Sequence, residues 1–229
     1  MRSGRTASAI PWRLVALAVV IIVVSTQPVF LLGAGFLDIG PEFGFGTPGL
    51  GALTAAFFLT ASLSSAPLGR VVQRIGWRQA MRINAAVSGL ILVGIAAMAH
   101  SLVVYAALIV AAGLVYGLAN PAANQALADH VDPAKLALIF GLKHAGIPSS
   151  TLVAGLAIPA IMVSFGWRPA YALYDLLTPV VWSLIPRGDP HAGTPSQSSA
   201  PRRTEAPLTT ALLDGLALRA ALATSAAIA

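Results

Sequence analysis

The chain has 229 residues, of which 57% are hydrophobic and only 10% are charged, and its mean hydropathy is +0.80. Soluble domains carry about 25% charged residues, so this composition excludes a soluble globular protein, and the absence of cysteine excludes disulfides, thiol catalysis and cysteine-ligated metals. The formal net charge of +6 does not indicate a nucleic-acid partner, because the basic residues lie in short clusters between apolar runs.

Three long uncharged runs predict helices that cross a lipid bilayer. Residues 14–37, 43–69 and 83–128 contain no Asp, Glu, Lys or Arg. About 20 apolar residues in a helix cross the hydrocarbon core, where every backbone group must be paired within the segment. We therefore expect an all-α, multi-span membrane helix bundle. Its spans are predicted at 13–36, 49–71, 80–99, 102–123, 138–163 and 169–186, with the start of a seventh near 208.

Two questions affect the first four spans: whether the first span is cleaved off, and where the third span ends and the fourth begins. Leu14–Val24 follows three arginines and is similar to the apolar part of a signal peptide, but the apolar run continues to Gly35 and no A-x-A cleavage site follows. We therefore expect the first span to be retained. The run 83–128 is too long for one span, and the polar pair His100–Ser101 predicts a tight turn that divides it.

The short loops predict the orientation, because Lys and Arg are enriched in cytoplasmic loops. A cytoplasmic N-terminus leaves Arg168 as the one basic residue on the opposite side, when Lys143 and Arg219, which fall within predicted spans, are set aside. We expect a multi-pass protein of the plasma (inner) membrane with its N-terminus in the cytoplasm. The basic residues on the cytoplasmic side are then Arg2, Arg5, Arg13, Arg70, Arg74, Arg78, Arg82, Lys135, Arg187, Arg202 and Arg203.

Composition divides the chain into three segments. Residues 188–207 are rich in Pro, Ser, Gly and Thr and are predicted to be a flexible cytoplasmic linker. Residues 1–187 before them form a predicted six-helix unit, and residues 208–229 are predicted to begin a seventh transmembrane helix.

A short internal repeat indicates the topology of the six-helix unit. Gly76–Ala80 reads GWRQA, and Gly166–Ala170, 90 residues later, reads GWRPA. Three predicted spans separate the copies, so they are expected on opposite sides of the membrane. This is the pattern of an inverted three-plus-three repeat, as in half of a secondary transporter. The alternative is a common interfacial turn, in which Gly ends a helix and Trp and Arg anchor it.

The first copy lies within a longer motif, Gly69–Gln79, that resembles the loop between the second and third helices of the major facilitator superfamily. The family pattern is G-x-x-x-[DE]-[RK]-x-G-x-[RK], and Gln73 replaces its acid. The resemblance implies that this loop latches the two halves of a carrier together in one conformational state. Gln73 cannot form the ionic part of that latch. The expected gating residues are Gly69, Gln73, Arg74, Gly76 and Arg78.

A second motif, Gly141–Pro148, reads GLKHAGIP and resembles a string in the cyanate-permease-like branch of the same superfamily, and Asn120–Asn124 fits that branch too. The resemblances cover about residues 12–187, so they imply the N-terminal six-helix half of a transporter that needs no cofactor or metal. We expect the C-terminal half to be missing from this apparently truncated chain, or replaced by a second copy.

Few polar side chains lie inside the predicted spans, and these are the candidate solute-binding residues. A charge in a span is costly unless it faces a wet cavity or a partner. Lys143 is therefore expected either to attract an anionic solute or to extend its ammonium group to the interface. His144 lies about 100° further around the helix than Lys143, so the two side chains cannot both face the same direction. Gln27 precedes a helix-breaking proline, and Asn120 and Asn124 complete the set of candidates.

Asp175 is the candidate proton-coupling residue. It is an acidic side chain predicted about six residues into the sixth span, and burial favours protonation of a carboxylate. The alternative is that the span is short and that Asp175 lies near its wet end. Residues 102–128 lack the arginine that proton-linked members of the superfamily often have in span four, so proton coupling stays open.

Three functions compete. The first is secondary active transport of a small anionic solute by alternating access, with the lipid bilayer and a second half as partners. The second is a truncated or non-transporting membrane protein. The third is a rhomboid-like intramembrane serine protease, with Ser88 in a string similar to G-x-S-G and His144 as its partner. The protease reading lacks the expected glycines after His144, and we rank it last.

Overall fold

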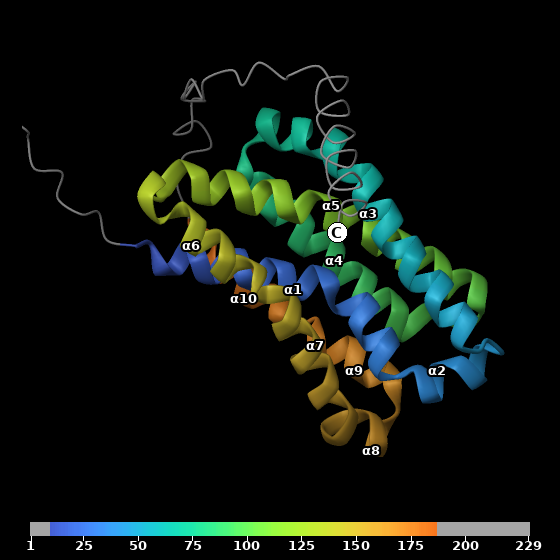
Figure 1. Cartoon of the computed structure of the whole chain (residues 1–229). Coiled ribbons are helices and arrows are strands. Elements are labelled where there is room, and N and C mark those ends of the chain that lie inside the picture. Colours follow the sequence, from blue (N-terminus) through green and yellow to red (C-terminus); the bar gives the residue numbers. More distant parts are fainter. Residues whose placement is uncertain (1–9, 187–229) are drawn as a thin grey trace, which may run out of the picture. The chain divides into compact units, whose positions relative to one another are not determined.

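The computed structural model describes residues 10–186, and within this range every regular element is a helix (Figure 1). The predicted linker 188–207 and the predicted seventh helix lie outside the described residues. The helices are α1 (Trp12–Ala34), α2 (Phe36–Phe43), α3 (Thr47–Ile75), α4 (Trp77–Met98), α5 (Leu102–His130), α6 (Pro133–His144), α7 (Gly146–Ala157), η1 (Ile158–Met162), α8 (Val163–Phe165), α9 (Trp167–Tyr174) and α10 (Leu177–Leu184).

Five helical segments of the described range are long and apolar enough to cross a membrane: α1, α3, α4, α5 and the segment from α6 to α8. Their bounds agree with the first five predicted spans to within seven residues. The turn predicted at His100–Ser101 is present, and the Ser101 hydroxyl caps α5 by accepting a hydrogen bond from the backbone N–H of Val104. The prediction of an all-α multi-span bundle is confirmed.

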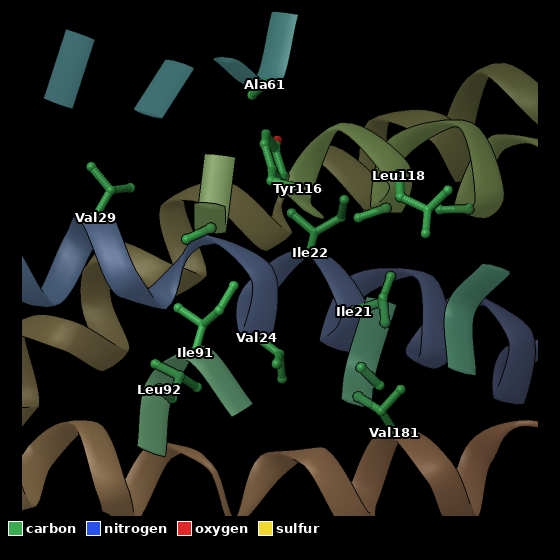
Figure 2. Packing of buried hydrophobic residues seen from close by; sticks show 14 of the residues in the cluster. Ile21, Ile22, Val24, Val29, Ala61, Ile91, Leu92, Tyr116, Leu118 and Val181 are labelled. Carbon is green, nitrogen blue, oxygen red and sulfur yellow. The ribbon is translucent and has the colours of Figure 1, made fainter. Parts of the chain in front are cut away.

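Helix α1 is the most deeply buried of these five segments. A helix that is apolar on all sides can be buried on all sides, and α1 has buried residues around its whole circumference. Figure 2 shows its side chains projecting both towards Leu118 of α5 and, on the opposite side, towards Leu92 of α4 and Val181 of α10. A polar side chain introduced into α1 would therefore lie inside the bundle rather than against lipid.

Three elements differ from the sequence predictions. The loop expected after the first span contains the short helix α2, which ends at Gly44 in the left-handed conformation (φ 71°). The fifth span is interrupted at Ala145, before Pro148, and its later part contains the π-helical turn η1. The predicted sixth span 169–186 consists of two eight-residue helices, α9 and α10, that are separated at Asp175 and Leu176.

Helices α3 and α5 lie side by side because glycines let their backbones approach (Figure 1). A Cβ atom added at Gly113 would lie 2.3 Å from the Phe57 carbonyl oxygen and 2.2 Å from the Thr60 hydroxyl oxygen. Small residues of this kind determine how closely membrane helices pack. By contrast, a Cβ atom at Gly94 of α4 would lie 3.6 Å from Leu108, an ordinary contact.

We expect Gly113→Ala to lower the stability of the detergent-solubilised chain by about 1–3 kcal/mol, because the added methyl group pushes against backbone that cannot rotate away. The matched substitution Gly94→Ala has space and a better helix former, so it should be neutral or stabilising by up to about 1 kcal/mol. Thermal unfolding followed by circular dichroism measures both. Equal melting temperatures for the two variants would contradict this packing account.

Candidate functional site

The most unusual side chain in the bundle is Lys143, which is 1% exposed in the last turn of α6. Its Nζ atom donates to Oδ1 of Asn124 at 2.7 Å and to Oδ1 of Asn120 at 3.1 Å. Both asparagines lie on α5, four residues apart and therefore on one face of that helix. The structure thus brings three of the predicted solute-binding residues together in one cluster, which we call the Lys143 cluster.

Lys143 lies near the end of α6, far from the start of that helix. Helix α6 begins five residues earlier than the expected span, because the Asp132 side chain caps it by accepting a hydrogen bond from the backbone N–H of Ala134. Lys143 therefore lies about 15 Å along the helix from its start. Its Nζ atom bonds to asparagines one to three turns before the end of α5, so the side chain extends across to that helix.

The Lys143 cluster has no carboxylate within the described residues. The ion pair found in that range joins Arg168 to Glu42, and no acidic side chain lies within ion-pairing distance of Lys143. A buried charge without a counter-ion is costly. The two amide oxygens stabilise the ammonium group by charge-assisted hydrogen bonds but leave its net charge uncompensated.

The hydrogen-bonding capacity left in the Lys143 cluster includes unused donors. An ammonium group has three N–H donors, and the asparagine oxygens accept two of them. Because both Oδ1 atoms face the cation, the Asn124 amide N–H groups point away from it, and they donate to no described residue. The Tyr116 hydroxyl interacts with Asn120 one turn earlier on the same face of α5. This combination of a positive charge and free donors suits an anion.

The other predicted solute-binding residues lie outside the Lys143 cluster. His144 is exposed and lies about a third of a turn around α6 from Lys143. Gln27 is fully buried beside Pro28 of α1, where its Nε2 atom lies 3.5 Å from the Ser150 carbonyl oxygen of α7, and its Oε1 atom has no partner among the described residues. Beside it, the Thr26 hydroxyl donates to the Ser150 hydroxyl at 2.8 Å. Gln27 therefore belongs to a separate polar contact between α1 and α7.

Asp175 lies where the chain is interrupted between α9 and α10. Its Oδ1 atom accepts a hydrogen bond from the Thr178 hydroxyl at 2.9 Å. The same oxygen would lie 2.4 Å from a Cβ atom added at Gly89, so the carboxylate packs directly against the backbone of α4. The side chain is half-buried and has no basic partner among the described residues.

The predicted gating loop is a single-residue turn between two helices. Gly69 lies inside α3 against Pro121, so it does not form part of the turn as the motif had indicated. Gly76 alone makes the turn, with φ at 80° in the region that favours glycine. Gln73 and Arg74 are exposed in the last turn of α3, while Arg78 lies over the face of Trp77, 4.9 Å from its ring centre.

The two copies of the repeated motif have the same local structure. Gly76 and Gly166 have φ values of 80° and 81°, and each precedes a helix whose first residue is a buried tryptophan. Arg168 lies over the ring of Trp167, 4.5 Å from its centre, just as Arg78 lies over the ring of Trp77. Gly76 precedes α4, and Arg168 donates to the carbonyl oxygen of Ala99, which follows α4. The copies therefore lie at opposite ends of α4, as an inverted repeat requires.

The sequence did not indicate how the second copy holds α2 in place. Arg168 Nη2 donates to Glu42 Oε1 at 2.5 Å, and Trp167 Nε1 donates to Glu42 Oε2 at 2.7 Å. Partial burial by itself raises the pKa of Glu42, but the hydrogen bonds from Arg168 and Trp167 and the charges of Arg168 and His100 outweigh it and hold this pKa below its ordinary value. We call this group the Glu42 clamp.

A cluster of aromatic side chains adjoins the Glu42 clamp and shares Trp167 with it. Phe43 stacks on Tyr105, and Trp167 packs edge-on against Tyr105 and Tyr171. Tyr171 donates to the Pro28 carbonyl oxygen at 3.1 Å and therefore accepts from the Tyr105 hydroxyl at 2.8 Å. These contacts join α1, α2, α5 and α9.

Sequence periodicity could have placed Tyr116 with the two asparagines of the Lys143 cluster. It could not have found the contacts of the aromatic cluster, because those residues lie far apart in the sequence.

The fold and the polar sites together define a multi-pass helical membrane protein. A family model described as Major Facilitator Superfamily matches residues 8–229, and the chain belongs to this family. Its members transport small solutes across lipid bilayers and are transporters rather than enzymes. A comparison with curated proteins gives no match.

We expect the Glu42 clamp to make stability depend on pH. Because the folded-state pKa of Glu42 is lowered, its contribution is present above the ordinary value of 4.5 and is lost as the pH falls through the folded-state pKa. Glu42→Gln should therefore be less stable than the unmodified chain at pH 7 and should lose this difference at low pH. Since both side chains are about a third exposed, the difference should be below about 1 kcal/mol.

Thermal unfolding between pH 3 and pH 7 measures the effect. The matched control is Asp38→Asn on the same helix, because Asp38 is exposed and its side chain makes no hydrogen bond or ion pair with a described residue. The control removes a carboxylate in the first turn of α2, so it should show only the small pH-dependent loss expected from the helix dipole. A stability difference for Glu42→Gln that stays constant across the range would show that the ion pair is not its source.

Proposed function

We propose that the chain transports a small anionic solute by alternating access, as one half of a two-half carrier, and that the Lys143 cluster binds the anion. The observation that carries this proposal is a buried ammonium group with two amide partners and no carboxylate among the described residues. Charged side chains within membrane spans commonly mark solute pathways. The family membership supports transport itself.

The donors of the Lys143 cluster favour an anion over a cation or a neutral solute. A cation would have to approach an uncompensated positive charge, and it would find the asparagine oxygens already engaged with Nζ. An oxyanion such as a carboxylate accepts hydrogen bonds from both the ammonium group and an amide. The resemblance of Gly141–Pro148 to the cyanate-permease-like branch agrees with a compact anion as the solute.

The partner of this half is proposed to be a C-terminal half or a second copy of the chain, with the site between them and the N-terminus in the cytoplasm of a plasma (inner) membrane. Gln73 leaves the loop between α3 and α4 without the acid of the family pattern, so we expect a weaker latch there. A non-transporting protein is the second candidate. Against the protease reading, no hydrogen bond joins Ser88 to His144, and His144 is exposed.

We expect anions to stabilise the purified chain through Lys143. Nitrate, cyanate, acetate and oxalate serve as probes, with choline and glucose as the cationic and neutral comparisons. At least one anion should raise the melting temperature, because a ligand that binds the folded state stabilises it by mass action. Lys143→Gln should remove this shift, since it removes the charge and leaves a side chain of similar length.

The matched control is Lys135→Gln, which makes the same change of charge at the start of α6. It should keep the anion-dependent shift, with an affinity within about threefold of the unmodified chain. Proteoliposomes that contain the chain with and without a co-expressed C-terminal half then test uptake of the same anions. An anion shift that survives in Lys143→Gln would exclude the Lys143 cluster as its binding site.

We further propose that Asp175 carries the coupling proton. The supporting observation is a half-buried carboxylate at a helix break, with a hydroxyl partner and no basic partner among the described residues. Asp175→Asn should abolish anion accumulation driven by a pH gradient but retain exchange of labelled for unlabelled anion, because exchange needs no net proton movement. Retained gradient-driven accumulation in Asp175→Asn would rule out this role.

A further inference from the structure

Three polar side chains lie in a row on one face of α5. Tyr116, Asn120 and Asn124 are spaced four residues apart, so each lies about 6 Å further along the helix than the one before. Asn124 is exposed, Asn120 is half-buried, and Tyr116, the middle residue of α5, is 7% exposed. The row therefore leads from the Lys143 cluster towards the interior of the bundle.

Asn120 connects the Lys143 ammonium group to the Tyr116 hydroxyl. Its Oδ1 atom accepts from Lys143 Nζ at 3.1 Å, and its side chain also hydrogen-bonds to Tyr116. Because Oδ1 faces the cation, the amide N–H groups are the part of Asn120 that meets the hydroxyl oxygen. The Tyr116 hydroxyl then accepts from Asn120 and keeps its own hydrogen, which no described residue accepts. A neutral O–H donor thus lies on the other side of Asn120 from the ammonium group.

The two donors are held at a limited separation. They hydrogen-bond to opposite ends of one carboxamide, and ordinary hydrogen-bond lengths then place Lys143 Nζ and the Tyr116 oxygen about 5–8 Å apart. The Tyr116 ring is fixed in turn, because it stacks on Phe57 of α3 at a centroid distance of 5.7 Å. A ligand that accepts from both donors therefore needs two oxygen atoms about 4–6 Å apart.

Charge limits this ligand to a single negative group. Lys143 supplies one positive charge and has no carboxylate partner among the described residues. A monoanion neutralises that charge, whereas a dianion would leave a net negative charge inside a membrane span, which is costly. The second oxygen of the ligand must therefore be neutral. A neutral carbonyl oxygen also suits the buried end of the row, where the Tyr116 hydroxyl satisfies it.

We propose that Tyr116 is a specificity-determining residue of the anion site and that the solute is a 4-oxocarboxylate, a monocarboxylate with a neutral carbonyl oxygen. The carboxylate binds Lys143 and the amide of Asn124, and the carbonyl oxygen, two methylene groups away, accepts from the Tyr116 hydroxyl. This inference rests on the proposed function, because the carboxylate has to bind at the Lys143 cluster. A site with a buried donor rejects a solute that leaves the donor unpaired.

Titration calorimetry of the purified full chain tests the pairing with four acids that differ at one position. Pentanoate has the carboxylate alone, 4-oxopentanoate adds the carbonyl at the proposed distance, and 2-oxopentanoate places the carbonyl next to the carboxylate. Succinate replaces the acetyl end of 4-oxopentanoate with a second negative charge. We expect 4-oxopentanoate to bind about three- to tenfold more tightly than pentanoate, as one net hydrogen bond provides, and more tightly than the other two acids.

Tyr116→Phe keeps the ring on Phe57 and removes only the hydroxyl. It should bind pentanoate with unchanged affinity, and its preference for 4-oxopentanoate should fall below about twofold. A hydroxyl with a merely structural role would change the affinities for both acids together. The matched control is Tyr174→Phe, because the Tyr174 hydroxyl donates instead to the Val153 carbonyl oxygen of α7. This control should keep the full preference.

An undiminished preference in Tyr116→Phe would overturn the inference. An unmodified chain that binds none of the four acids, or that binds pentanoate or succinate at least as tightly as 4-oxopentanoate, would overturn it too. The proposed function stands in these cases if Lys143→Gln removes the binding of the acids or of nitrate while Lys135→Gln keeps it. Anion binding that survives Lys143→Gln would instead disprove the anion site, and the inference would fail with it.

Discussion

A buried ammonium group held by two amide oxygens is the interaction on which this account depends. In a hydrocarbon medium a charge needs a counter-ion, water or strong hydrogen-bond acceptors, and the hydrogen-bond acceptors of Lys143 among the described residues are Asn120 and Asn124. Those acceptors stabilise the cation without neutralising it. An unneutralised charge in such a place is a cost to stability, and the anion binding proposed above would account for it.

The rest of the bundle gives that charge a fixed position. Helix α1 packs on all sides inside the described part of the chain, and the glycines of α5 bring α3 into close contact. The Glu42 clamp and the tyrosines beneath it join α1, α2, α5 and α9 at one end. Because α5 is held along most of its length, its asparagines present a rigid surface to Lys143. Rigid placement of this kind is what makes a polar site selective.

The sequence was sufficient for features that depend on local composition. The long uncharged runs located the five long helical segments. The repeated GWR string predicted turns at opposite ends of the bundle, where Gly76 and Gly166 are found. It was insufficient where distant residues decide the outcome. The Asp132 cap starts α6 five residues before the predicted span, and the partners of Glu42 are more than 120 residues away. Gln27 was grouped with Lys143, although Ser150 holds it elsewhere.

The central claim is that the positive charge of the Lys143 cluster is there to receive an anion. Crystals of the chain grown in bromide, with anomalous diffraction measured at the bromine edge, test it without knowledge of the natural solute. We predict an anomalous peak within contact distance of Lys143 Nζ and the Asn124 amide nitrogen. Ordered bromide found elsewhere in the protein with none at Lys143, or a carboxylate seen paired with Nζ, would contradict the account.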